Sequence, residues 1–89
     1  MFKVVHLHRM VRKLKAEGAV NAQQADLFLA RRSAAMALLH AKTTVLLADK
    51  RPAAKKLAQG LGDGQLLKKL WERREEILAF IREIVKLFG

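Results

Sequence analysis

The 89-residue chain contains no cysteine, so it can form neither a disulfide bond nor a thiolate metal site. It also has no tyrosine and only one proline. Charged residues interrupt even its most apolar stretch, 27–48, and we therefore expect no transmembrane helix. The first residues show neither an unbroken apolar segment nor a small-residue cleavage site, so we expect no secretory signal and predict a protein of the cytoplasm or of a nucleoprotein particle.

The chain offers few groups for catalysis or metal binding. Its single serine, Ser33, has no base beside it, and His40 lies within an apolar segment. His6 and His8 are two residues apart, so on a helix they point about 160° apart and cannot share a metal ion. Residues 3–8 also alternate as in a short strand, on which the two histidines would share a face but still lack a third ligand. We therefore predict no catalytic, cofactor-binding or metal-binding residue.

Positive charge dominates the composition. Eighteen Lys and Arg residues face eight Asp and Glu residues, which gives a net charge of +10 and an isoelectric point near 10.8. Such a charge is most easily tolerated beside a polyanion, either a phosphate backbone or anionic lipid headgroups. The alternative is a solvated basic surface that only keeps the protein soluble. Because 52% of the residues are hydrophobic, we expect a folded domain rather than a disordered basic tail.

Hydrophobic periodicity and turn residues predict one all-α domain over residues 1–89. Gly18 ends the first helix, Asn21 can cap the second together with Gln24, and Pro52 opens the third. Glycines at 60, 62 and 64 precede the last helix. The predicted helices span residues 2–17, 22–50, 52–59 and 64–88, and they form a helical hairpin or small bundle of three to four helices with one long central helix.

The central predicted helix is too long for a compact monomer. It would extend about 43 Å, whereas a globule of this size is about 30 Å across. It must therefore kink, near Thr43 and Thr44, or protrude and pack against another copy of the chain. We favour an oligomer, because a line of small residues would let a second helix approach closely. This predicted packing interface consists of Ala30, Ala34, Ala37, Ala41 and Ala48.

The first predicted helix is cationic and amphipathic. Val4, Leu7, Val11 and Leu14 recur at three- and four-residue spacing and form an apolar stripe, with Met10 beside them. Basic residues occupy the opposite side, and the excess positive charge of the chain lies in its N-terminal half. Polyanion binding is predicted at ten clustered basic residues: Arg9, Arg12, Lys13, Lys15, Arg31, Arg32, Lys50, Arg51, Lys55 and Lys56.

The last predicted helix has a wide apolar face and a polar face of mixed sign, which favours a packing role. Arg74 falls near the middle of its apolar face. We interpret Arg74 as an arginine that snorkels or forms a salt bridge at an edge, the alternative being contact with a phosphate or an interface carboxylate. Three ion pairs are expected along this helix: Lys68 with Glu72, Arg73 with Glu76, and Glu83 with Lys86.

Gly60-Leu61-Gly62 is a Gly-hydrophobic-Gly turn between two predicted helices, and it resembles the helix-hairpin-helix DNA-binding motif. The resemblance is confined to this turn and its flanks. It implies backbone amides that grip one phosphate without reading bases, assisted by lysines at 55, 56, 68 and 69. The chain departs from the motif at Asp63, which places a negative charge near the phosphate, and at Leu66, where the motif prefers a small residue. The alternative is an interhelical turn with a glycine C-cap.

Together these features predict a binding or structural protein that is not an enzyme. Its expected partner is nucleic acid, bound through phosphates without sequence preference, as in packaging by a nucleoid- or virion-type subunit. Single-strand stacking is not expected, because the five aromatic residues fall mostly on packing faces. Two alternatives stay open: an amphipathic protein at a membrane surface, and a helical adaptor or inhibitor that binds an acidic protein. A small-molecule substrate is not expected.

Overall fold

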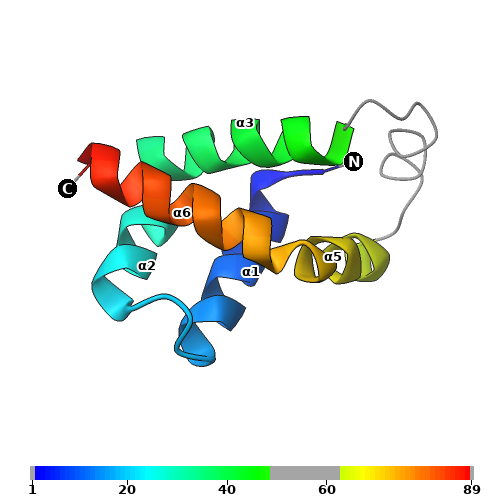
Figure 1. Ribbon diagram of the computed structural model, residues 1–89, viewed down its shortest axis with the longest axis horizontal. Helices are drawn as coiled ribbons and strands as arrows, with labels where there is room; N and C mark the ends of the chain where they lie inside the picture. Colours follow the sequence, from blue (N-terminus) through cyan, green and yellow to red (C-terminus); the bar gives the residue numbers. More distant parts are fainter. Residues whose placement is uncertain (1, 49–62, 89) are drawn as a thin grey trace.

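The computed structural model describes residues 2–48 and 63–88, and all secondary structure in these two ranges is helical. The helices are α1 (Val4–Ala16), α2 (Ala22–Leu29), α3 (Ala34–Ala48), α5 (Asp63–Glu72) and α6 (Arg74–Phe88) (Figure 1). The predicted all-α class is therefore confirmed. None of the helices in these ranges is long and apolar enough to cross a membrane.

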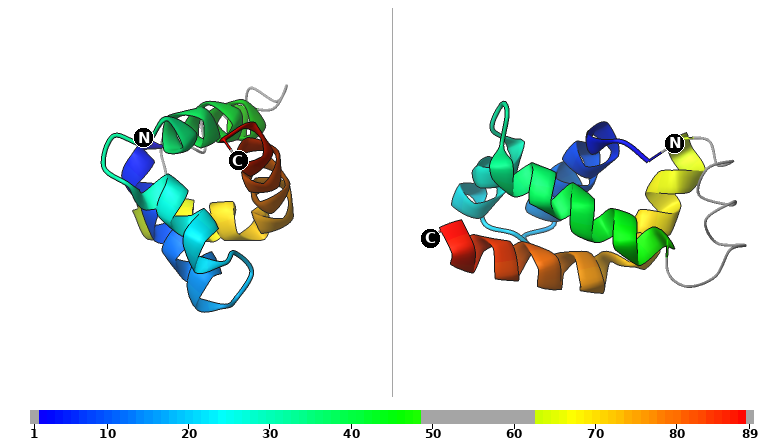
Figure 2. Two further views of the ribbon diagram at one scale, coloured as in Figure 1. Left: turned by 90° about the vertical axis from the view of Figure 1, so that its left-hand side faces the viewer. Right: turned by 90° about the horizontal axis from the view of Figure 1, so that it is seen from above.

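α3 and α6 lie side by side and run in opposite directions (Figure 1). An ion pair joins their middles, with Lys42 Nζ 3.4 Å from Glu83 Oε2. α1 and α2 pack against each other on the other side of the core, and α5 packs against α1 (Figure 2). The fold thus places α1 between α2 and α5, two elements that are far apart in the sequence.

The core lies where these helices meet. Phe28 of α2 is fully buried there, and α6 contributes an isoleucine stripe of Ile77, Ile81 and Ile84. α1 buries most of the stripe that its spacing predicts, whereas Val4, in the first turn, is 37% exposed. The buried residues of this stripe are Leu7, Val11 and Leu14, and Met10 beside the stripe is buried as well.

The alternative of a short strand over residues 3–8 is wrong, because α1 begins at Val4. Lys3 is the N-cap, and its backbone N–H donates a 2.9 Å hydrogen bond to Nδ1 of His6. His6 is 2% exposed, whereas His8 lies half-buried. The two histidines therefore point apart, as their spacing on a helix requires.

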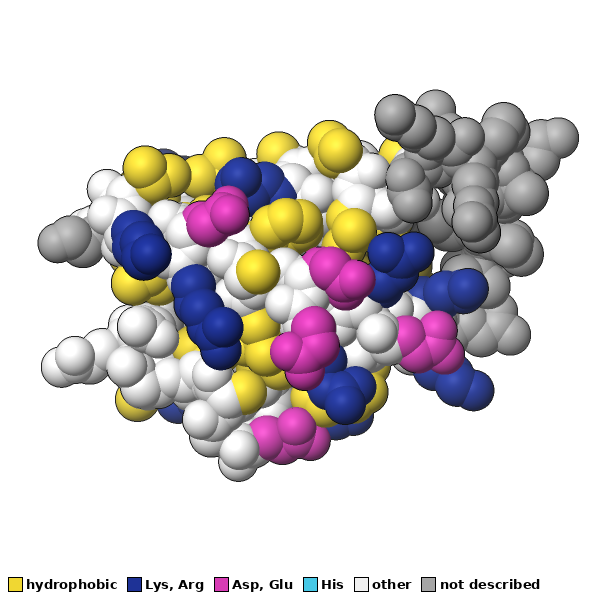
Figure 3. Space-filling model, viewed as in Figure 1, with side chains coloured by type: hydrophobic (Ala, Val, Ile, Leu, Met, Phe, Trp, Pro, Cys, Tyr) yellow, Lys and Arg dark blue, Asp and Glu magenta, His cyan; other side chains and the backbone are white. Residues whose placement is uncertain are grey.

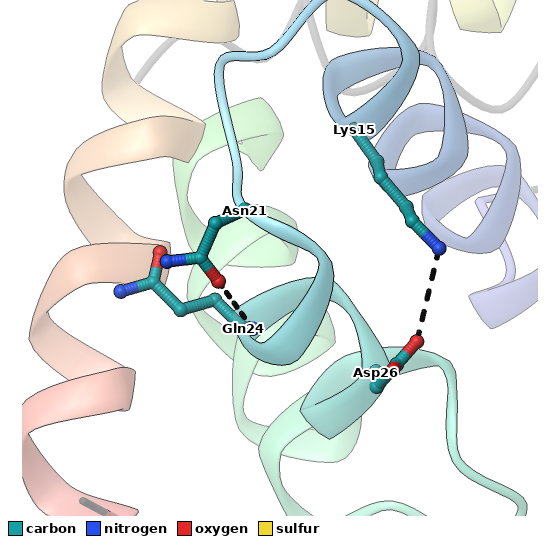
Figure 4. Close-up of polar contacts among 4 residues, drawn as sticks. All are labelled: Lys15, Asn21, Gln24 and Asp26. Atoms are coloured by element: carbon teal, nitrogen blue, oxygen red, sulfur yellow. Dashed lines mark hydrogen bonds and ion pairs between the residues drawn. The ribbon is translucent and has the colours of Figure 1, made fainter.

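The link between α1 and α2 follows the predicted helix boundaries. Gly18 has a φ of +79°, and its N–H donates to the Lys15 carbonyl while Ala19 N–H donates to the Leu14 carbonyl. This pair of bonds is the Schellman arrangement, which favours glycine because other L-residues are strained at such a φ. Asn21 then caps α2 by accepting a 2.8 Å bond from the backbone N–H of Gln24 (Figure 4).

The predicted helix over residues 22–50 is wrong, because the chain breaks between α2 and α3. Ala30 adopts an extended ψ of 143°, and Arg32 has a φ of 61°. The hydroxyl of Ser33 donates to the Leu27 carbonyl and accepts a 3.1 Å bond from Met36 N–H. Ser33 thereby caps α3 in the manner of N-cap residues. The break at 30–33 resolves the length conflict, and Thr43 and Thr44, the alternative place for a kink, both lie within α3.

The predicted helix over residues 64–88 is likewise two helices, α5 and α6, that meet at Arg73. The N–H of Arg73 bonds to the Leu70 carbonyl three residues back, and Ile77 N–H then bonds to the Arg73 carbonyl. Because both long predicted helices are broken, the described ranges contain five helices and not three to four. The predicted helix over 52–59 and the turn Gly60-Leu61-Gly62 lie outside the described residues.

The ion pairs of α5 and α6 differ from the expected ones. Arg73 NH1 lies 3.9 Å from Glu76 Oε1, which confirms that pair. Glu83 instead reaches across to Lys42 of α3. Within the described ranges, no ion pair joins the other predicted partners, Lys68 with Glu72 and Glu83 with Lys86.

Candidate functional site

α1 carries basic residues around its exposed arc and no acidic residue. The buried side chains occupy one side of the helix, so the remaining positions project into solvent. All four predicted basic residues of α1 are exposed: Arg9, Arg12, Lys13 and Lys15. The structure therefore presents this part of the predicted polyanion-binding set on one helix.

The two lysines near the end of α1 face different neighbours. Lys15 Nζ lies 3.9 Å from Asp26 Oδ1 of α2 (Figure 4). Both side chains are well exposed, so this ion pair contributes little to stability. Lys13 lies on the other side of α1 and meets Trp71 of α5. α1 thus directs positive charge towards both α2 and α5.

Residues of α1 and α5 line an open surface pocket of about 320 Å³. Its apolar wall comes from Met10, Leu67 and Trp71. Its remaining lining residues are all basic and consist of Arg9, Lys13 and Lys68. Because no acidic residue lines the pocket, its electrostatics favour an anion, and its apolar wall favours a ring or an alkyl group beside that anion.

Trp71 is the centre of this site. Lys13 Nζ lies 4.2 Å from a ring centroid of the indole, and the guanidinium carbon of Arg74 lies 5.3 Å from a ring centroid. Both distances fall within the range of cation–π attraction. Arg74 NH1 also donates a 3.1 Å hydrogen bond to the Trp71 carbonyl. Arg74 is exposed, so the interpretation of an arginine at the edge of the apolar face agrees with its position.

The other predicted basic residues do not line this pocket. Arg31 and Arg32 are exposed in the turn between α2 and α3. The remaining four lie outside the described residues and comprise Lys50, Arg51, Lys55 and Lys56. Among the ten predicted positions, the structure therefore brings Arg9 and Lys13 together in one pocket.

Sequence reasoning missed the contribution of α5. The wide apolar face predicted for residues 64–88 includes Leu67 and Trp71, and the sequence places Lys68 in an ion pair with Glu72 or beside the turn that resembles the helix-hairpin-helix motif. The available signal was the spacing of cations around the tryptophan, since Lys68 and Arg74 each stand three residues from Trp71. That spacing places charges beside the indole ring and indicates that it is near solvent.

The predicted alanine interface is exposed throughout. Ala34, Ala37, Ala41 and Ala48 lie on the outer face of α3, whereas Ala30 is the C-cap of α2 and belongs to a different helix. Val45, on the same outer face, is 72% exposed. No charged residue occupies this face, and Figure 3 shows hydrophobic side chains gathered along the upper edge of the molecule, over α3. These five residues, Ala34, Ala37, Ala41, Val45 and Ala48, form the outer face of α3.

Within the described ranges, no three His, Asp or Glu side chains are grouped so that they could hold a metal ion. Comparison of the chain with protein-family models, with curated proteins and with solved structures finds no match.

Proposed function

We propose that this protein binds nucleic acid through the phosphate backbone, without reading base sequence, and that α1 is the contact helix. The observation that carries the proposal is the convergence of Arg9 and Lys13 of α1 with Lys68 of α5 around one pocket that has no acidic lining. A polyanion can bind several of these cations at once and release the counterions condensed on its phosphates.

The unpaired state of the cations supports this proposal. Within residues 2–48 and 63–88, no ion pair involves Arg9, Arg12 or Lys13. Their charges are not neutralised inside the described fold, and the chain as a whole carries a net charge of +10. Exposed, unneutralised charge of one sign raises the local concentration of anions and speeds their association.

We further propose that two copies associate through the outer face of α3. α3 is apolar on nearly all sides, and such helices are normally buried. Charge also favours a second copy as the partner. Two chains of +10 repel each other, and an uncharged face is where they can approach with the least like-charge contact. Packaging of nucleic acid by an oligomer would follow from both contacts.

The first test is fluorescence anisotropy with labelled duplex DNA, titrated over a range of salt concentrations. We compare the wild type with a triple variant of α1, Arg9→Gln, Arg12→Gln and Lys13→Gln. A control variant removes the same charge from exposed positions elsewhere: Lys69→Gln, Arg82→Gln and Lys86→Gln. The α1 variant should bind more weakly, and its plot of log affinity against log salt should be shallower by about 2 to 3.

Equal losses in the two variants would show that net charge alone drives binding and that α1 is not the contact helix. Anionic vesicles serve as the competitor. Vesicle binding that persists at high salt, together with weak DNA binding, would favour the membrane-surface alternative. Absence of binding to both would overturn the proposal and leave an acidic protein as the partner.

A further inference from the structure

We propose that the pocket between α1 and α5 holds one unstacked nucleobase against Trp71, with the flanking phosphates on Arg9, Lys13 and Lys68. This inference rests on the proposed nucleic-acid binding and specifies it further, because it makes single-stranded nucleic acid the preferred ligand. Trp71 packs against the core, as expected for most of the aromatic residues, but it is only half-buried and so keeps part of its ring surface available.

The apolar wall of the pocket indicates a ligand with more than a phosphate group. Phosphate binding needs positive charge and no apolar surface. This pocket nevertheless combines its three cations with Met10, Leu67 and Trp71. Its volume of about 320 Å³ is at the small end of the range for ligand pockets, roughly 300–1,000 Å³. A planar ring joined to phosphates matches both the apolar wall and the cations, whereas a bare phosphate matches only the cations.

The position of Lys13 over Trp71 shows which face of the indole a base could occupy. Lys13 Nζ covers a ring of the indole at 4.2 Å, and Lys13 forms no ion pair within the described residues. Its side chain is exposed and flexible, so the ammonium group can move to a phosphate and uncover the ring. A base can then take its place on the indole, since every base has a face that stacks on an aromatic ring.

Arg74 stays in place during this exchange. Its hydrogen bond to the Trp71 carbonyl fixes the guanidinium beside the indole. The base would therefore stack on an indole ring whose orientation Arg74 has already set. A base inside a duplex is stacked and paired and cannot enter the pocket without being extruded. Single strands should consequently bind better than duplexes of equal charge.

Tryptophan fluorescence gives a direct test, because Trp71 is the only tryptophan of the chain and there is no tyrosine. The intact protein is titrated with a short oligothymidylate, with an abasic oligonucleotide of the same length, and with an acidic peptide that contains phenylalanine. Oligothymidylate should quench Trp71 and bind about 5- to 150-fold more tightly than the abasic strand, the range expected for one stacked base.

Two variants separate stacking from stability. Trp71→Leu keeps apolar volume but removes the stacking surface. Phe80→Leu is its matched control, because Phe80 is also half-buried and carries a lysine, Lys42, 5.7 Å from its ring centroid. Measured by anisotropy, Trp71→Leu should lose the preference for oligothymidylate and keep its affinity for the abasic strand, which also shows that it is folded. Phe80→Leu should keep both, and Trp71→Phe should retain part of the preference.

Equal affinity for the two strands without quenching would overturn the base site and leave phosphate binding by α1 intact. Absence of binding to either strand would overturn the proposed function and the base site together. Quenching by the acidic peptide alone would also overturn both and would identify the pocket as a peptide site.

Discussion

The ring of Phe2 stacks on the imidazole of His40, with centroids 4.8 Å apart and ring planes 6° from parallel. Phe2 also stacks more loosely on His6, at 6.1 Å. The carbonyl oxygen of Phe2 lies 3.4 Å from Nε2 of His40. This contact ties the segment before α1 to the middle of α3 and so helps to hold the contact helix in position.

Phe2→Ala should lower the free energy of unfolding by about 1–2 kcal/mol, because it removes the stacked pair and the apolar area that this pair buries. Phe88→Ala is the control, since Phe88 stands at the end of α6 and is 48% exposed. The measurement is chemical denaturation followed by circular dichroism. Equal effects of the two substitutions would contradict a specific role for the stack.

Ser33→Ala should destabilise the protein by about 1–2 kcal/mol, because it removes the N-cap of α3 together with the bond to the Leu27 carbonyl. Thr44→Ala provides a matched hydroxyl deletion, as Thr44 Oγ1 bonds to the His40 carbonyl on an exposed side of α3. That bond lies within the helix, so its loss should change stability by less than about 0.5 kcal/mol. Thermal unfolding of both variants measures the contribution of the Ser33 hydroxyl, and equal losses of stability would contradict a specific role for this cap.

Gly18→Ala should destabilise the protein by about 1–2 kcal/mol, although open space surrounds the position where a Cβ would be added. The cost arises from the φ of +79°, which strains L-residues. Gly18→Asn should lose less, because asparagine tolerates this backbone conformation better. Equal stability of Gly18→Ala and wild type would show that the turn adjusts its backbone.

The proposed contact through the outer face of α3 predicts that substitutions on this face change the oligomeric state. Ala41→Glu should shift the protein towards monomer in size-exclusion chromatography with light scattering, because it places charges within the proposed contact. Ala79→Glu is the matched control on an exposed position of α6. Ala37→Leu should also weaken association by overpacking a close helix contact. A wild type that stays monomeric at high protein concentration would contradict the α3 contact.

Local signals predicted the parts of the fold that depend on neighbouring residues. The periodicity of α1, the stop at Gly18 and the cap at Asn21 each involve residues within a few positions of one another, and the structure agrees with all three. The break at Ser33 was missed because apolar residues continue on both sides of it. Nothing in the helix-forming pair Arg73 and Arg74 marks the boundary between α5 and α6.

The candidate site could be predicted only in part, for a related reason. Arg9 and Lys13 are evident from the charge pattern of α1. Their partners Leu67, Lys68 and Trp71 belong to a helix more than fifty residues away, and only tertiary packing brings the two helices together. Exposure of an aromatic residue is likewise set by its neighbours in space, which a local pattern does not contain.

The placement of α3 has a consequence for what a dimer could do. α3 runs along the upper edge in Figure 1 and α1 lies below it, while the hydrophobic side chains over α3 gather along the same upper edge in Figure 3. Two copies joined through α3 would carry their α1 helices on opposite outer sides of the pair. Such a particle would be divalent, and each half would raise the effective concentration of nucleic acid at the other. It would cross-link separate strands and condense them, where a monomer could only coat one.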